Sequence, residues 1–182
     1  MKIYKYPYSK SHTRNDTDSF ISEAVKKYAE AEGILPTGGL FVKRTPLGKP
    51  FAEGYKGVYI SVTHADEILL VAVSECEIGI DCESKSRKTR DMNALAGRFF
   101  TPAEKERFAG VNPDGREIFF LETWTKKEAL VKLSGEGLAA ITRTDSQNPP
   151  PGVSLTVIDD YPGYVVSAAE KNAVSEVRNN NG

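Results

Sequence analysis

Residues 58–83 read VYISVTHADEILLVAVSECEIGIDCE, and this stretch decides the fold class. It contains three segments rich in β-branched and aliphatic residues, at 58–63, 68–74 and 78–82. Short polar links separate the three segments. Such links favour an antiparallel meander, because parallel strands need long crossover connections.

Helical patterns flank this β-rich stretch on both sides. Apolar residues recur at helical spacing over 19–32, where Thr17 or Asp18 can cap the start and Gly33 ends the helix. Downstream, Thr101-Pro102-Ala103-Glu104 has the composition of a capping box with proline at the first helical position. The longest predicted helix runs over 115–134, with Gly135 or Gly137 as its stop.

Three further strands are predicted at 138–143, 153–158 and 164–169, and the polar, basic segment 84–90 is predicted to be a mobile loop. The order of helix, strands, two helices and strands predicts an α+β fold of two similar small lobes. We expect each lobe to be an antiparallel sheet with helical cover, the two related by a pseudo-twofold axis. The expected N-terminal lobe spans 1–77, and the C-terminal lobe spans 78–182.

Composition excludes several classes of partner. The 182 residues carry a net charge of -1, so no overall field attracts nucleic acid or an anionic membrane. No segment approaches the roughly 20 apolar residues of a membrane helix, and the N-terminus lacks the apolar core of a signal peptide. Two cysteines, Cys76 and Cys82, are too few for a disulfide framework. We therefore expect a soluble, cytoplasmic protein.

Two carboxylates lie two residues apart in Gly79-Ile80-Asp81-Cys82-Glu83. On a strand, Asp81 and Glu83 project from the same face, and their mutual repulsion is relieved when they share a divalent cation. The alternative is a solvated acidic face without a metal.

The long helix carries Trp124, Glu128 and Lys132 on one stripe, four residues apart. A surface Glu–Lys pair worth a few tenths of a kcal/mol is the alternative. The aromatic residue on the same stripe favours a pair held in place by packing.

Two isolated features could bind phosphate. Lys49, in Gly48-Lys49-Pro50 with Arg44 upstream, can reach a phosphate from a turn, although most such tripeptides are only turns. His64 can donate a hydrogen bond to phosphate, and we reject a zinc site because no His or Cys partner lies at zinc-ligand spacing.

In combination these motifs resemble a known family. The order GKP, SVTHA, GIDCE, RFFTPAE and WTKKEALVKLSGEGL is similar to the 4′-phosphopantetheinyl transferase superfamily, in its two-lobed type that serves surfactin and siderophore synthetases. The resemblance runs from Arg44 to Leu138, with an echo at Pro162-Gly163-Tyr164. The paired signatures GID-x-E and WT-x-KEA-x-x-K, about 45 residues apart, are highly specific together.

The resemblance implies a set of roles. Asp81, Glu83 and Glu128 would bind Mg²⁺, or Mn²⁺ in its place. Lys127 and Lys132 would contact the coenzyme A pyrophosphate, and Thr63 with His64 would bind its 3′-phosphate. Lys49 and Pro50 would line the adenine and ribose end, with Arg44 as a weaker candidate.

The implied reaction moves the phosphopantetheine arm of coenzyme A to a serine of an apo acyl or peptidyl carrier protein, releasing 3′,5′-ADP. Glu128 is the candidate base and Lys132 the residue that stabilises the leaving group. Lys85, Arg87, Lys88, Arg90 and Arg98 could meet an acidic carrier, or could simply be solvated. We expect a monomer. Alternatives are another magnesium-dependent phosphotransferase or phosphohydrolase, and a non-catalytic binder of coenzyme A or carrier protein.

Overall fold

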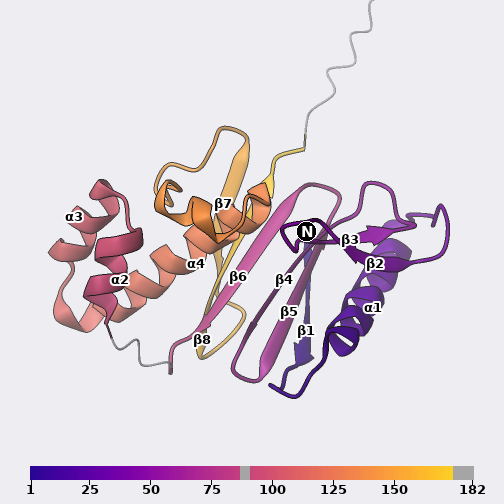
Figure 1. Ribbon diagram of the computed structural model, residues 1–182, viewed down its shortest axis with the longest axis horizontal. Helices are drawn as coiled ribbons and strands as arrows, with labels where there is room; N and C mark the ends of the chain where they lie inside the picture. The colour runs from indigo at the N-terminus through magenta and orange to yellow at the C-terminus, as the bar shows by residue number, and fades with distance from the viewer. Residues whose placement is uncertain (87–90, 174–182) are drawn as a thin grey trace, which may run out of the picture.

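The chain forms two antiparallel sheets that lie side by side (Figure 1). The computed structural model describes residues 1–86 and 91–173. The first sheet has five strands in the order β1-β5-β4-β3-β2, and the second has three in the order β6-β8-β7. The strands are β1 (Lys2–Pro7), β2 (Phe41–Arg44), β3 (Pro50–Glu53), β4 (Tyr59–Ala65), β5 (Ile68–Ser74), β6 (Ile78–Ser84), β7 (Val153–Ile158) and β8 (Tyr164–Lys171).

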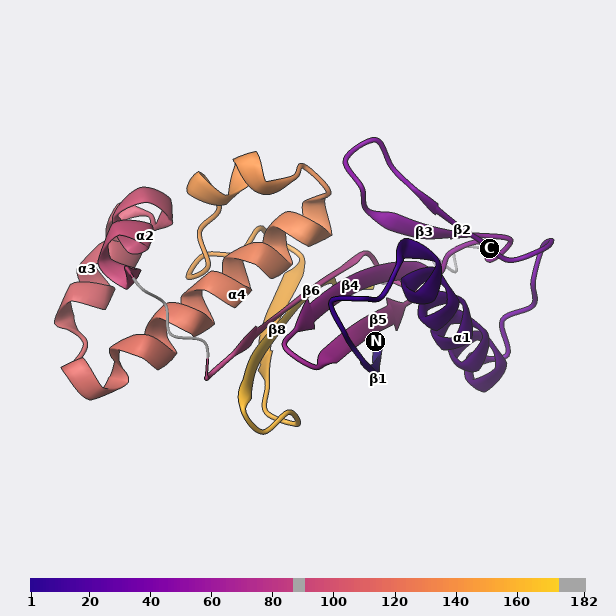
Figure 2. The ribbon, with the colours of Figure 1, turned by 60° about the horizontal axis from the view of Figure 1, so that its bottom comes forward.

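Helices complete both parts of the molecule, and the predicted α+β class is confirmed. The helix α1 belongs to the first sheet, whereas α4 lies along β6 and β8 of the second (Figure 2). The helical segments are α1 (Arg14–Glu32), α2 (Met92–Phe99), α3 (Pro102–Gly110), α4 (Arg116–Ser134) and the short 3-10 turns η1 (Pro113–Gly115) and η2 (Leu138–Thr142).

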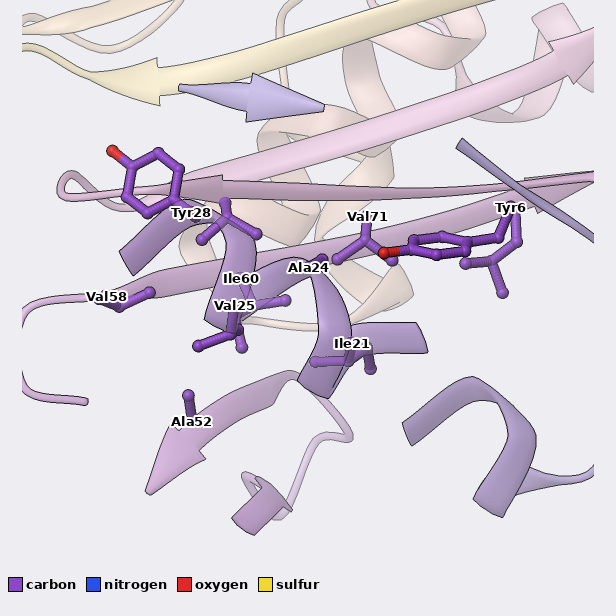
Figure 3. Close-up of a cluster of buried hydrophobic side chains, with 11 residues drawn as sticks. Tyr6, Ile21, Ala24, Val25, Tyr28, Ala52, Val58, Ile60 and Val71 are labelled. Atoms are coloured by element: carbon purple, nitrogen blue, oxygen red, sulfur yellow. The ribbon is translucent and has the colours of Figure 1, made fainter. Parts of the chain in front are cut away.

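Helix α1 covers one face of the first sheet. It begins with a capping box in which the Thr13 hydroxyl accepts from the Asp16 N–H and Asp16 reaches back to Thr13, and it ends at Gly33 in the left-handed conformation. Its apolar stripe packs against the sheet and forms the core drawn in Figure 3. This core contains Tyr6, Ile21, Ala24, Val25, Tyr28, Ala52, Val58, Ile60, Leu69, Val71 and Val73.

Strand β5 is buried along its whole length, because both of its faces are covered. Leu69, Val71 and Val73 face α1, whereas Leu70 and Ala72 face the second sheet. There they join an apolar cluster with Ile78, Ile80, Cys82 and Val166. A continuous apolar run in the sequence is the expected signature of such a strand. This shared cluster holds the two sheets together.

Helix α4 packs on β6 and β8 of the second sheet. The approach is closest at Gly79, where a Cβ would lie 2.0 Å from the carbonyl oxygen of Ala129 and 2.4 Å from the amide nitrogen of Leu133. Only a residue without a side chain fits there. The buried hydroxyls of Thr125 and Ser167, 2.8 Å apart, add a polar contact between α4 and β8.

Several sequence-based expectations need correction. The segment 138–143 is not a strand: it forms the 3-10 turn η2, in which Ala140 and Ile141 are buried and Leu138 is exposed. The third segment of the expected meander, β6, does not belong to the same sheet as β4 and β5. It pairs with β8 in the second sheet. Strand β1 and helix α2 were not predicted. The predicted loop 84–90 lies partly outside the described residues, since β6 extends to Ser84 and 87–90 are not described.

Candidate active site

The acidic strand motif and the tryptophan-bearing helix motif meet at a cleft between the two sheets. The cleft has a volume of about 650 Å³ and receives side chains from β4, β6 and α4, and from the segment between β1 and α1. Among the residues that line it are Tyr8, Lys10, Thr63, His64, Asp81, Glu83, Glu128 and Lys132.

Backbone geometry brings the acidic side chains together. Gly79, Asp81 and Glu83 share one face of β6. Helix α4 lies directly over Gly79. The side chains that α4 directs along β6 from that point therefore reach the two carboxylates of the strand. Glu128 and Lys132 are one helical turn apart and both line the cleft. The packing at Gly79 thereby brings two charged residues of the strand, Asp81 and Glu83, and two of the helix, Glu128 and Lys132, into a single site.

The two oxygens of Asp81 have different environments. Oδ1 accepts from the Nζ of Lys132 at 2.6 Å and from the Oγ1 of Thr63 at 3.1 Å. Oδ2 is buried and has no hydrogen-bond partner among the described residues. The side chain of Asp81 is 6% exposed, and a buried carboxylate oxygen without a partner is costly unless a cation binds it.

Glu128 has a strongly perturbed pKa. Burial and, after it, the charges of Asp81 and Glu83 together raise the pKa of this carboxyl to about 7, against the opposing effects of Lys132 and of a hydrogen bond from Trp124. Three carboxylates therefore lie close enough to repel one another. Such a cluster is stabilised in its charged form when a divalent cation is bound.

The donor set fits Mg²⁺, but the side chains are not yet arranged as ligands. Carboxylate oxygens are what Mg²⁺ prefers, and Asp81 Oδ2 lacks any other partner. Within residues 1–86 and 91–173, however, no three His, Cys, Asp or Glu side chains are grouped closely enough to hold a metal ion. The ammonium of Lys132 contacts Asp81 instead.

His64 lies beside the acidic cluster. Its ring stacks on Tyr8, with the ring centroids 4.1 Å apart and the planes at 16°. Burial lowers the pKa of the imidazole, and the charge of Lys132 lowers it further. A neutral imidazole still offers one N–H donor, so His64 can hydrogen-bond a phosphate oxygen at neutral pH.

A second cleft adjoins the first. It has a volume of about 530 Å³, and Glu128 and Lys132 line both. Its other walls are mostly apolar and include Lys49 and Pro50. The Nζ of Lys49 donates to the carbonyl of Leu133 at 2.7 Å, which attaches the turn between β2 and β3 to the end of α4. The clefts together form one elongated depression between the lobes.

A sequence model described as "4′-phosphopantetheinyl transferase superfamily" matches residues 77–172. This segment contains β6, α4 and β8, and with them Asp81, Glu83 and Glu128. The chain belongs to the 4′-phosphopantetheinyl transferase superfamily.

Proteins named 4′-phosphopantetheinyl transferase are among its relatives. HetI of Nostoc sp. is 38% identical over 96 residues, which cover 52% of this chain and 39% of HetI. The protein psf-1 of Bacillus pumilus is 29% identical over 58% of this chain and 44% of its own length. AcpT of Escherichia coli is 32% identical over 54% of this chain and 51% of its own length. The matches thus span about half the length of the relatives or less.

Two residues assigned from the phosphopantetheinyl transferase pattern, Arg44 and Lys127, line neither of the two clefts. Lys127 is fully buried and pairs with Glu104 at 2.8 Å. The Nζ of Lys127 also donates to the carbonyl of Thr144. Arg44 forms a two-pronged ion pair with Asp18 of α1, at 2.5 and 3.2 Å. Both side chains have structural partners and face no phosphate site.

Two further residues, Tyr8 and Lys10, line the first cleft. Tyr8 packs on His64, and Lys10 adds a positive charge to the rim. Both precede the first helix, in a polar segment whose periodicity gives no sign of a site. Their role depends on β1 pairing with β5, which brings this segment next to the end of β4.

Proposed function

We propose that this chain transfers the 4′-phosphopantetheine arm of coenzyme A to a serine of an apo acyl or peptidyl carrier protein. The observation that carries the proposal is the meeting of Asp81 and Glu83 of β6 with Glu128 and Lys132 of α4 in one cleft. Membership of the superfamily supports it, as do relatives named for this activity.

Asp81, Glu83 and Glu128 are the proposed ligands of Mg²⁺, or of Mn²⁺ in its place. The metal supplies, when bound, a positive charge for the pyrophosphate oxygens. The mutual repulsion that raises the pKa of Glu128 and the unpartnered Oδ2 of Asp81 both support this assignment. Lys132 must leave Asp81 in the process.

Lys132 and Glu128 have complementary roles in the proposed reaction. The ammonium of Lys132, once released from Asp81, stabilises the 3′,5′-ADP that leaves as the phosphorus–oxygen bond breaks. A carboxylate oxygen of Glu128 accepts the proton of the attacking serine hydroxyl.

The clefts suggest how coenzyme A is oriented. Lys49 and Pro50 are the proposed contacts of adenine and ribose in the second, more apolar cleft. His64 is the proposed contact of the 3′-phosphate, with Lys10 adding positive charge nearby. Burial lowers the pKa of the Lys49 ammonium, and an incoming phosphate would favour its charged form.

The division into lobes and the choice of partner are also proposals. The first sheet ends at Ser74 and the second begins at Ile78, which supports a boundary between 77 and 78. A site built from both lobes of one chain supports a monomer. Lys85 and Arg98 are exposed and suited to an acidic carrier, whereas Arg87, Lys88 and Arg90 lie outside the described residues.

A cytoplasmic setting agrees with coenzyme A as co-substrate and with the free thiols of Cys76 and Cys82. Among the described helices, none has the length and apolar character needed to cross a membrane.

One assay tests the proposal. The protein is incubated with coenzyme A, Mg²⁺ and an apo carrier protein, and the carrier is weighed by mass spectrometry. A gain of one phosphopantetheine supports transfer. Coenzyme A cleaved with the carrier unchanged would point to a phosphohydrolase, and binding without reaction would point to a non-catalytic module. A panel of fatty acid, polyketide and peptide carriers then identifies the substrate.

A further inference from the structure

Two hydroxyls of β4 bind the backbone of β6 across the boundary between the sheets. The N–H of Ile80 donates to Ser61 Oγ at 3.0 Å, and the N–H of Cys82 donates to Thr63 Oγ1 at 3.2 Å. Ser61 and Thr63 are 3% and 5% exposed. Since these N–H groups point away from β8, the hydroxyls satisfy donors that would otherwise be buried and unpaired.

Only one of these two hydroxyls also touches the acidic cluster. Thr63 Oγ1 lies 3.1 Å from Asp81 Oδ1. A hydroxyl has one hydrogen to donate, and here an ionised carboxylate is the acceptor. The donor of Thr63 is therefore committed to Asp81, and one of its lone pairs is committed to Cys82. That leaves Thr63 poorly suited to bind a phosphate of coenzyme A.

We propose that Thr63 is a positioning residue that orients the carboxylate of Asp81 for the divalent cation. Its hydrogen bond to Oδ1 restricts the rotation of the carboxylate and leaves Oδ2, which has no hydrogen-bond partner among the described residues, available to the cation. This inference rests on the proposed function, since it concerns the proposed metal ligand.

The hydrogen bond of Thr63 persists when the other partner of Asp81 leaves. Lys132 is 29% exposed and holds Oδ1 only by a flexible side chain that must move for the cation to bind. Thr63 is anchored by the backbone of both strands, and its β-branched side chain restricts rotation about χ1. The carboxylate therefore remains preset for the ion after Lys132 has moved.

Ser61 provides the matched control. It makes the same type of contact to β6, is equally buried, and has no recorded bond to a site carboxylate. The variants Thr63→Val and Ser61→Ala each remove one hydroxyl from the contact between β4 and β6. The variant Thr63→Ser keeps a hydroxyl at position 63.

Mn²⁺ affinity is measured by the fluorescence of Trp124, the single tryptophan, which hydrogen-bonds Glu128. Coenzyme A affinity is measured by calorimetry in EDTA, and stability by thermal unfolding. We expect Thr63→Val to weaken Mn²⁺ binding about tenfold or more, as loss of a partner of a metal ligand does. Coenzyme A affinity should stay within about threefold in EDTA, and Thr63→Ser should recover most of the Mn²⁺ affinity. Ser61→Ala should lower the melting temperature as Thr63→Val does and leave Mn²⁺ binding unchanged.

Three results would overturn the inference. One is unchanged Mn²⁺ affinity in Thr63→Val, or no Mn²⁺ binding by the wild-type protein. Another is an equal loss of Mn²⁺ affinity in Ser61→Ala, which would show that Thr63 acts only by holding β4 against β6 and not by orienting Asp81. The third is a loss of coenzyme A affinity in EDTA with Mn²⁺ binding intact, which would make Thr63 a phosphate ligand. Wild-type protein that binds Mn²⁺ without transferring phosphopantetheine would refute the proposed function alone.

Discussion

Asp81 and Lys132, 51 residues apart in the sequence, form an ion pair of 2.6 Å between β6 and α4. The pair joins the two halves of the superfamily's signature. It also means that the cation now bound to Asp81 is the protein's own lysine. If a metal and a pyrophosphate bind as proposed, each partner of the pair gains a new counter-charge, so each binding step would favour the other.

Replacing Lys132 by alanine should slow transfer far more than it weakens coenzyme A binding. The ammonium acts on charge that grows as 3′,5′-ADP leaves, and removal of one such group typically costs about 10²–10³ in kcat. We expect KM for coenzyme A to change by about threefold or less, which steady-state kinetics can check.

The control is Lys126→Ala, on the same helix but paired only with Glu122 at 3.7 Å. It should leave both constants unchanged. A Lys132→Ala enzyme with normal kcat and a raised KM would show that Lys132 only binds the substrate.

Replacing Glu128 by glutamine should abolish transfer and yet stabilise the metal-free protein above neutral pH. The pKa of Glu128 is raised to about 7 in the folded state, so folding favours its protonated form. Its stabilising contribution is present at low pH and is lost as the pH rises from about 4.5 through 7.

At pH 8 in EDTA, glutamine should raise the free energy of unfolding by on the order of 2 kcal/mol, and the advantage should disappear near pH 4. Urea denaturation across this pH range measures the difference. A variant that is less stable than wild type at pH 8, or that retains near-normal turnover, contradicts the assignment of Glu128.

The sequence predicted best those elements whose pattern is set by local burial. The strands β4, β5 and β6, the capping box at Thr101 and the stop of α4 at Gly135 all appear close to their predicted places. Each depends on nearby residues, either through an apolar run or through a cap. The proposed metal residues follow from motifs of the same local kind.

Long-range pairing was not predictable in this way. Strand β1 reads Lys-Ile-Tyr-Lys-Tyr-Pro, without a clear alternation of apolar and polar residues, and it becomes a strand because it pairs with β5. The segment 138–143 forms a 3-10 turn shortly after the end of α4, and none of the described strands pairs with it. Whether Lys127 meets a phosphate or a buried glutamate depends on the packing of α3 against α4, which no motif encodes.

Replacing Gly79 by alanine should displace α4 from the acidic strand. The new Cβ would lie 2.0 Å from the Ala129 carbonyl oxygen, and both close atoms belong to the backbone. We expect a destabilisation of about 3 kcal/mol and a loss of transfer, because Glu128 and Lys132 move away from Asp81.

The matched control is Gly97→Ala in α2, where a Cβ would meet nothing within 4 Å. That change should be neutral or stabilising by about 0.5–1 kcal/mol, since alanine favours a helix. Thermal unfolding of both variants gives the comparison, and an unperturbed Gly79→Ala enzyme would refute the close approach.

Replacing Lys127 by methionine should lower the stability of the C-terminal part of the chain and leave the affinity for coenzyme A unchanged. Glu104 accepts from Lys127, from the Thr101 N–H and from Ser146, all in a buried site. Removing the single cation of this network typically costs about 3–5 kcal/mol.

Denaturation curves should show this loss, whereas Lys126→Met should change stability by about 0.5 kcal/mol or less. Coenzyme A affinity, measured where Lys127→Met is still folded, should equal that of the wild type. A stable variant with weakened coenzyme A binding would return Lys127 to the phosphate site.

The central claim is that β6 and α4 together hold one divalent ion beside coenzyme A. Crystals grown with coenzyme A and Mn²⁺ test it through the anomalous scattering of manganese. We expect one peak bounded by Asp81, Glu83 and Glu128, with Lys132 moved from Asp81 to the pyrophosphate. Coenzyme A bound with the ion elsewhere, or with the Asp81–Lys132 pair intact, would contradict it.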